Sequence, residues 1–290
     1  MCVLSQPAIA EYTLMLVAGY YDESADEFED WVYTVAGYTA PGRQASIFEL
    51  RWAALLKKWN LAYFKASEIE AGFGEFAQYR DDLKNLKLPL TKREKDLIRT
   101  IKIEFVDLIC KEPDLWGFSA TVNLRDYKLL KIQEPDLAQR IPKPYYLCGQ
   151  LVMVETGYHL AESNSISPSW AKGLLRPIFD SHNDYSRTMI DSFKEFSEKN
   201  PESSRYMLPP LYEKEQTYLC LQAADCLAFE SRKFAFNSEH DAEREPRKAF
   251  LRLMEHVRTA YYLDYEALKH IASSQDQPDI QPIEPIIRNS

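Results

Sequence analysis

The feature that most limits how this chain folds is the alternation of short apolar runs, rich in β-forming residues, with longer amphipathic stretches. Leu14–Tyr21 and Trp31–Thr39 are two such runs, and the acidic segment between them predicts a hairpin connection. Later runs alternate with stretches of helical spacing, which is typical of parallel strands joined by helical crossovers. The sequence therefore predicts an α/β protein with a mixed sheet flanked by helices.

The expected strands share a high content of β-branched and aromatic residues. They are Leu14–Tyr21, Trp31–Thr39, Ala62–Lys65, Trp116–Asn123, Leu174–Phe179 and Leu211–Glu215. The expected helices repeat apolar residues every three or four positions. They are Gly42–Asn60, a helix opened by a Thr91/Glu94 capping box, Tyr145–Ala161, Ser186–Lys199, Thr217–Phe236, and a last helix with Phe250, Leu253, Val257 and Tyr261. We expect one domain over residues 1–272, with a mostly helical insertion at about 42–112 after the second strand, and a polar tail at 273–290.

Composition excludes several function classes. The chain has nine glycines and no phosphate-binding G-x-x-x-x-G-K-[ST] loop, which argues against ATP or NAD chemistry through the standard loops. A net charge of −9 argues against holding nucleic acid by bulk electrostatics, although a carboxylate site counts as negative until metal fills it. The five cysteines are dispersed and form no zinc motif, and neither a signal peptide nor a membrane span is expected. We therefore expect a cytoplasmic protein.

Three aspartates stand out by their context. Asp22 and Asp180 each follow an apolar strand directly, and catalytic groups in α/β sheets commonly lie where strands end. Asp225 lies within an apolar helical stretch, where an unpaired buried carboxylate is expensive and needs a hydrogen-bonding partner, a cation or a metal. Gln222 lies three residues earlier on the same helical face.

Each of these residues also has a structural interpretation. Asp22 and Asp180 fit turns, and a salt bridge could account for Asp225. Glu23 and Glu68 suit surface or capping positions, and Gln222 could bond to backbone instead of substrate. His182 and Asn183 lie beside Asp180, but a single histidine in a polar turn is typical of a surface residue.

The order of these motifs resembles a known family. Asp22-Glu23-Ser24 followed late in the chain by Gln222-x-x-Asp225 resembles the domain of unknown function 3800 family, whose fold is ribonuclease H-like. Phe64-Lys65-Ala66 resembles the family's Phe-His-Ala segment, with Lys65 where His is usual. Ala25 stands where Gly is usual. The resemblance spans about Tyr20 to Phe229 and implies a nuclease-like fold.

From this resemblance we expect a metal-dependent nuclease or phosphodiesterase. Asp22, Asp180 and Asp225 would bind Mg²⁺ or Mn²⁺, because hard cations prefer oxygen ligands. Glu23 or Glu68 would add a catalytic or supporting carboxylate, and Gln222 would support the site or contact substrate. The expected substrate is a nucleic acid, with a protein partner or a homo-oligomer as further associations, and a defence or toxin-like system is a setting for such a nuclease.

Two other functions remain open from the sequence. A non-catalytic module on the same fold would use a tyrosine-rich surface to bind RNA or protein, and it would have no metal site. A glycosidase would use two of the carboxylates in an aromatic cleft without metal.

Overall fold

The computed structural model describes residues 15–25, 31–82, 88–166, 173–181, 186–199, 201–241 and 243–274. Its centre is one mixed sheet of six strands in the order β5-β4-β1-β2-β3-β6. The strands are β1 (Met15–Ala25), β2 (Val32–Pro41), β3 (Trp116–Asn123), β4 (Gly173–Asp180), β5 (Leu211–Glu213) and β6 (Val257–Leu263). Within this sheet β2 pairs antiparallel with β1 and β3, whereas the other neighbouring strands pair in parallel. The predicted α/β class and the first hairpin are confirmed.

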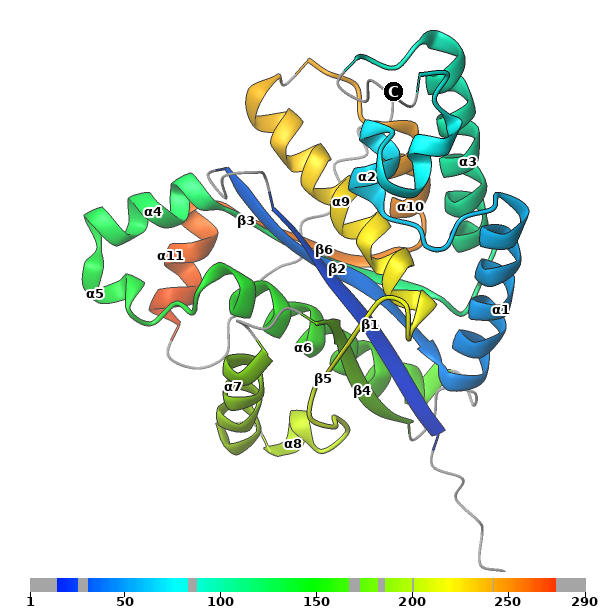
Figure 1. Cartoon of the computed structure of the whole chain (residues 1–290). Coiled ribbons are helices and arrows are strands. Elements are labelled where there is room, and N and C mark those ends of the chain that lie inside the picture. The colour runs from blue at the N-terminus through cyan, green and yellow to red at the C-terminus, as the bar shows by residue number, and fades with distance from the viewer. Residues whose placement is uncertain are drawn as a thin grey trace, which may run out of the picture.

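Helices cover both faces of the sheet (Figure 1). On one face α6 packs with α4, α5, α7 and α11, and on the other α9 packs with α1, α2, α3 and α10. Every residue of β2 is buried, as expected for a central strand with helices on both sides. The helices are α1 (Gly42–Lys58), α2 (Ala66–Ala71), η1 (Gly74–Tyr79), α3 (Lys92–Cys110), α4 (Leu124–Gln133), α5 (Pro135–Ala138), α6 (Pro144–Ile166), α7 (Ser186–Lys199), α8 (Pro201–Ser204), α9 (Leu219–His240), α10 (Lys248–Met254) and α11 (Tyr265–Ser273). None of the helices, within the described ranges, is long and apolar enough to cross a membrane.

The alternation of side chains along β1 divides that strand between two cores. Val17 and Tyr21 belong to the core on the α6 face, whereas Ala18 and Tyr20 belong to the core on the α9 face. Adjacent side chains of a strand point to opposite faces. Asp22, two residues beyond Tyr20, therefore points toward α9.

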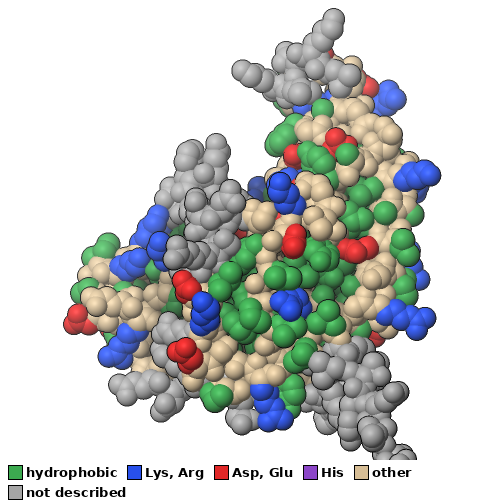
Figure 2. Space-filling model, turned by 60° about the horizontal axis from the view of Figure 1, so that its bottom comes forward, with side chains coloured by type: hydrophobic (Ala, Val, Ile, Leu, Met, Phe, Trp, Pro, Cys, Tyr) green, Lys and Arg blue, Asp and Glu red, His purple; other side chains and the backbone are tan. Residues whose placement is uncertain are grey.

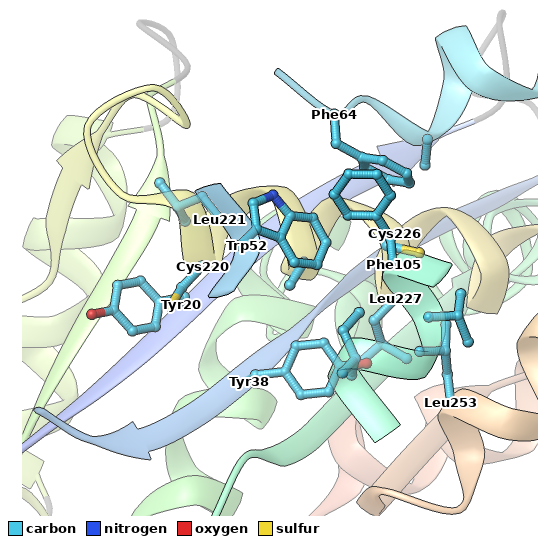
Figure 3. Packing of buried hydrophobic residues seen from close by; sticks show 14 of the residues in the cluster. Tyr20, Tyr38, Trp52, Phe64, Phe105, Cys220, Leu221, Cys226, Leu227 and Leu253 are labelled. Atoms are coloured by element: carbon cyan, nitrogen blue, oxygen red, sulfur yellow. The ribbon is translucent and has the colours of Figure 1, made fainter. Parts of the chain in front are cut away.

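Aromatic rings fasten the segment between β2 and β3 to the core on the α9 face (Figure 3). The Trp52 ring of α1 lies 4.7 Å from the Phe105 ring of α3 and 5.6 Å from the Phe64 ring, measured between centroids. All three side chains are fully buried. This helical segment therefore packs directly against the sheet and α9.

Two sequence predictions were wrong. Residues 62–65 form no strand, because the Phe64 amide bonds to a side chain of α9 and α2 begins at Ala66. The last predicted helix is divided into α10, β6 and α11. Val257 and Tyr261 fit a helical repeat after Leu253, but in β6 the buried residues alternate and pair in parallel with β3. The same analysis missed α4, whose N-terminus is capped by the Asn123 side chain.

Several other helix and strand limits agree with those predicted from the sequence. The expected capping box of α3 is present, since Thr91 and Glu94 exchange side chain to backbone hydrogen bonds. The strand Trp116–Asn123 and the helix Ser186–Lys199 have the predicted limits. Residues 275–290, most of the predicted tail, lie outside the described residues.

Gly37 offers a test of the β1–β2 packing. A Cβ atom at Gly37 would overlap the carbonyl oxygen of Tyr20 in the neighbouring strand. We expect Gly37→Ala to lower the free energy of unfolding by about 1–3 kcal/mol, because the two strands must separate to admit a methyl group. Urea denaturation measures this change.

Gly157→Ala is the matched control. Gly157 lies in α6, and its nearest neighbour, the Met207 sulfur, is 3.5 Å from the position of a Cβ atom. Alanine there should raise the free energy of unfolding by about 0.5–1 kcal/mol, because a helical glycine costs conformational entropy. Equal effects of both substitutions would contradict the close approach at Gly37.

Candidate active site

Asp22 and Asp180 lie on neighbouring parallel strands. The last paired residues of β1 and β4 are Tyr21 and Phe179, so each aspartate comes directly after this pair. Asp180 ends β4 as predicted. Asp22 does not end β1, because that strand continues to Ala25 in its pairing with β2, and the interpretation of Asp22 as a turn residue is wrong. His182 and Asn183 lie outside the described residues.

Asp225 lies on α9, which packs against β1 and β2, and its side chain lies near Asp22 and Asp180. Burial raises the pKa of Asp22 well above its usual value, and the negative charges of Glu23, Asp225 and Asp180 add to the effect. Burial likewise raises the pKa of Asp225 to about 6, although the Ala66 amide opposes the change. The structure thus brings the three predicted aspartates within electrostatic reach of one another.

Asp22 and Asp225 are buried, Asp180 is partly exposed, and, within the described chain, the positive charge nearest to them is that of Lys65. Asp22 and Asp225 are each only 7% exposed. Asp22 Oδ1 accepts a hydrogen bond from the Glu23 amide at 2.8 Å, and Asp225 Oδ2 accepts one from the Ala66 amide at 2.6 Å. No basic side chain in the described ranges lies within ion-pair distance of Asp22, Asp180 or Asp225. The salt-bridge interpretation of Asp225 is therefore not supported by the described residues.

Glu215 and Lys65 complete the electrostatics of the cluster. Glu215 is 9% exposed, and burial raises its pKa to about 7, with further increases from neighbouring carboxylates. Burial lowers the pKa of the half-buried Lys65, but the surrounding negative charges, Glu215 foremost, outweigh burial and raise it. Sequence reasoning assigned Glu215 no role, because one glutamate after a short strand carries no distinguishing signal. The sequence distinguished Lys65 only because it stands where the resembling family usually has a histidine.

Gln222 holds the chain before α2 against α9. Its Oε1 accepts hydrogen bonds from Trp52 Nε1 and from the Phe64 amide, both at 2.9 Å. Its Nε2 donates to the Glu215 carbonyl oxygen at 3.3 Å. Gln222 is fully buried. These contacts agree with the interpretation of Gln222 as a residue that bonds to backbone.

Glu23 and Glu68, the two glutamates predicted to support the site, lie in different surroundings. Glu23 follows Asp22 on β1 and so points toward the opposite face. There its charge adds to burial in raising the pKa of Tyr145 and Tyr212. Glu68 lies on α2, and both of its carboxylate oxygens accept bonds from Tyr63 Oη, at 3.0 and 2.9 Å. The structural interpretation of Glu68 is therefore favoured.

The chemistry of the donors fits a hard divalent cation. Asp22, Asp180 and Asp225 supply carboxylate oxygens, and their mutual repulsion is the kind that a metal ion offsets. In the described part of the chain no group of three or more His, Cys, Asp or Glu side chains already has the spacing that holds an ion. Binding would therefore require the carboxylates to move closer together.

A group of cations lies beside the acidic cluster. Arg232, Lys233 and Arg247 surround the Phe229 ring of α9, with charged groups 5.1, 5.6 and 5.9 Å from its centroid. Arg232 Nε donates to Ser24 Oγ at 2.9 Å, and Ser24 is two residues beyond Asp22 on the same face of β1. Burial and then the neighbouring Arg232 lower the pKa of Lys233, whereas Arg247 forms ion pairs with Glu70 and Glu230.

The surface has no large basic field on the face shown in Figure 2. Apolar side chains gather at its centre, and the Lys and Arg side chains visible there are scattered among Asp and Glu. This distribution agrees with the net charge of −9.

No protein family, curated protein or solved structure matches the chain. The site is therefore defined by its own geometry, as a group of carboxylates at one end of a mixed α/β sheet, in which Asp22 and Asp225 are buried and Asp180 is partly exposed.

The raised pKa values of Asp225 and Glu215 predict how stability changes with pH. Without metal, the folded protein keeps protons on these groups at a pH where the unfolded chain has lost them. Their contribution to the free energy of unfolding therefore falls as pH rises from about 4 to about 7. Asp225→Asn, which keeps an oxygen acceptor for the Ala66 amide, should remove part of this fall.

Urea denaturation in EDTA at pH 5 and pH 8 measures the effect. Between pH 5 and pH 8 the free energy of unfolding of wild type should fall by at least about 1 kcal/mol more than that of Asp225→Asn, since one pKa unit corresponds to about 1.4 kcal/mol. Asp136→Asn, at an exposed position of α5, should behave as wild type. The same pH dependence in Asp225→Asn and wild type would contradict the raised pKa.

Proposed function

We propose that this protein is a metal-dependent phosphodiesterase, most specifically a nuclease of ribonuclease H-like type. The observation that supports it is the burial of Asp22 and Asp225 beside Asp180 without an ion-pair partner in the described residues. A carboxylate cluster that forms no ion pair within the described part of the chain, and has only the nearby charge of Lys65 to offset its repulsion, costs stability and persists where its charge serves a purpose. Asp22 on the first strand, Asp180 at the end of a later strand and Asp225 on a core helix also fit the resemblance to the domain of unknown function 3800 family.

The chain's own groups would prepare the site. Asp22, Asp180 and Asp225 would hold Mg²⁺ or Mn²⁺, and the bound ion would supply a Lewis acid for the phosphate and an activated water. The Ala66 amide orients the Asp225 carboxylate, and the Glu23 amide orients that of Asp22. Lys65 brings a positive charge to the same cluster and would lie near the phosphate of a bound substrate.

Nucleic acid is the substrate class that the neighbouring charges favour. Arg232 and Lys233 lie on α9 beyond Asp225, and Arg247, the N-cap of α10, lies against the same Phe229 ring. Arg232 contacts the strand that carries Asp22. Arg232 and Lys233 would offer positive charge to the phosphates of a polynucleotide, whereas Arg247 is already paired with Glu70 and Glu230. A small local group of cations beside the acids also explains how a protein with a net charge of −9 would hold such a chain.

A tyrosine-rich binding surface has less support. Eight tyrosines of the described residues lie in the core, namely Tyr20, Tyr21, Tyr33, Tyr38, Tyr127, Tyr145, Tyr146 and Tyr261. These rings pack the layers of the fold and are not available to stack on bases. The proposal therefore rests on the carboxylates and not on aromatic stacking.

The nuclease proposal predicts activity that depends on both metal and Asp225. Purified protein should cleave labelled oligonucleotides in Mn²⁺ or Mg²⁺ and not in EDTA, with single- and double-stranded DNA and RNA as parallel substrates. Asp225→Asn should lower the rate more than about 100-fold, because even outer-shell changes at metal sites cost about 10- to 100-fold. Circular dichroism confirms that the variant is folded.

The control variant is Asp136→Asn, which should cleave at the wild-type rate. Cleavage by a folded Asp225→Asn protein at the wild-type rate would remove Asp225 from the mechanism. Cleavage in EDTA would contradict the role of the metal, and failure of wild type to cleave any of the four substrates would contradict the nuclease proposal.

A further inference from the structure

A cavity of about 260 Å³ lies on the α9 face of the sheet, between β3, β6, α9 and α10. It exists because small side chains meet there, including Ser119 of β3, Ala260 of β6 and Ala235 of α9. Larger residues at these positions would close the space between helix and sheet. The carboxylate cluster does not line this cavity.

Aromatic and sulfur-containing side chains form much of its wall. The Phe234 ring of α9 and the Phe250 ring of α10 are stacked, with centroids 4.2 Å apart and planes 9° from parallel. Met254 of α10 lines the cavity beside them. Such walls give an aromatic ligand both apolar burial and favourable ring and sulfur contacts, whereas water gains little there.

One polar group in this wall has no partner within the described residues. Ser231 of α9 lines the cavity, and its Oγ, which is buried, makes no hydrogen bond to the described residues. An unpaired buried hydroxyl is costly, and a ligand acceptor would offset that cost. Tyr262 Oη, by contrast, donates to Glu239 Oε1 at 2.5 Å and accepts from Asn123 Nδ2 at 3.2 Å.

Size and charge narrow the class of ligand. An apolar cavity of about 150 Å³ holds benzene, so this larger one suits a fused ring system of the size of indole or naphthalene. The carboxylate of Glu239, also in the lining, disfavours an anionic ligand. Glu239 already accepts a hydrogen bond from Tyr262 Oη, and the other described residues that line the cavity are uncharged, which favours a neutral bicyclic aromatic molecule.

We propose that this cavity is a binding site for a neutral, bicyclic aromatic molecule whose single polar group accepts a hydrogen bond from Ser231. The rings lie against Phe234, Phe250 and Met254, and the polar group lies at the Ser231 hydroxyl. This site is independent of the proposed nuclease activity, because it needs neither the metal nor the three aspartates.

The test uses 2-naphthol as the probe, with the full-length protein in EDTA. Its fluorescence should change saturably with one site per chain. Ala235→Phe, which places a ring in the cavity, should weaken binding at least tenfold. Ser231→Ala should weaken it about fivefold, the value of one hydrogen bond of ordinary strength.

Ala53→Phe is the matched control, since Ala53 lies on the exposed side of α1. It should bind 2-naphthol as wild type does. Absence of saturable binding to wild type would overturn the proposal. Wild-type affinity in both Ser231→Ala and a folded Ala235→Phe protein would also overturn it, because the probe would then bind elsewhere.

Discussion

Two side chains of α9 fasten the chain between β2 and β3 to the sheet, and the candidate site depends on this attachment. The Gln222 side chain accepts a hydrogen bond from the Phe64 amide, and the Asp225 side chain accepts one from the Ala66 amide. Segment 64–66 therefore has side-chain acceptors in place of a strand partner, which a buried backbone requires. The same contact fixes Asp225 toward Asp22 and places Lys65 beside the acids. The helical segment and the acidic cluster thus share the same two hydrogen bonds to α9.

Much of the fold could be predicted from the sequence because the elements have strong local signals. The hairpin of β1 and β2 and the capping box of α3 follow from alternation, turn composition and spacing. β6 was missed because Leu253, Val257 and Tyr261 also fit a helical repeat, and only pairing with β3 decides between the two. Residues 62–65 were misassigned for a similar reason, since their partner is a glutamine side chain distant in sequence.

The candidate site was predictable in part. Asp22, Asp180 and Asp225 stood out because each adjoins or interrupts an apolar run, and the structure places them close to one another. The surroundings of Glu215 could not be read in advance, because its burial depends on how the chain before α9 folds onto the cluster. Glu68 accepts a hydrogen bond from Tyr63, which lies just before α2, a local contact that its position near the resembling motif did not indicate.

Calorimetric titration of Mn²⁺ tests the central claim, that the buried carboxylates form a metal site, most directly. The account predicts saturable binding to wild type, and loss of that binding in Asp22→Asn. Asp191→Asn, which removes an exposed carboxylate of α7, should leave it unchanged. Equal Mn²⁺ binding by wild type and Asp22→Asn, or no binding by wild type, would contradict the claim.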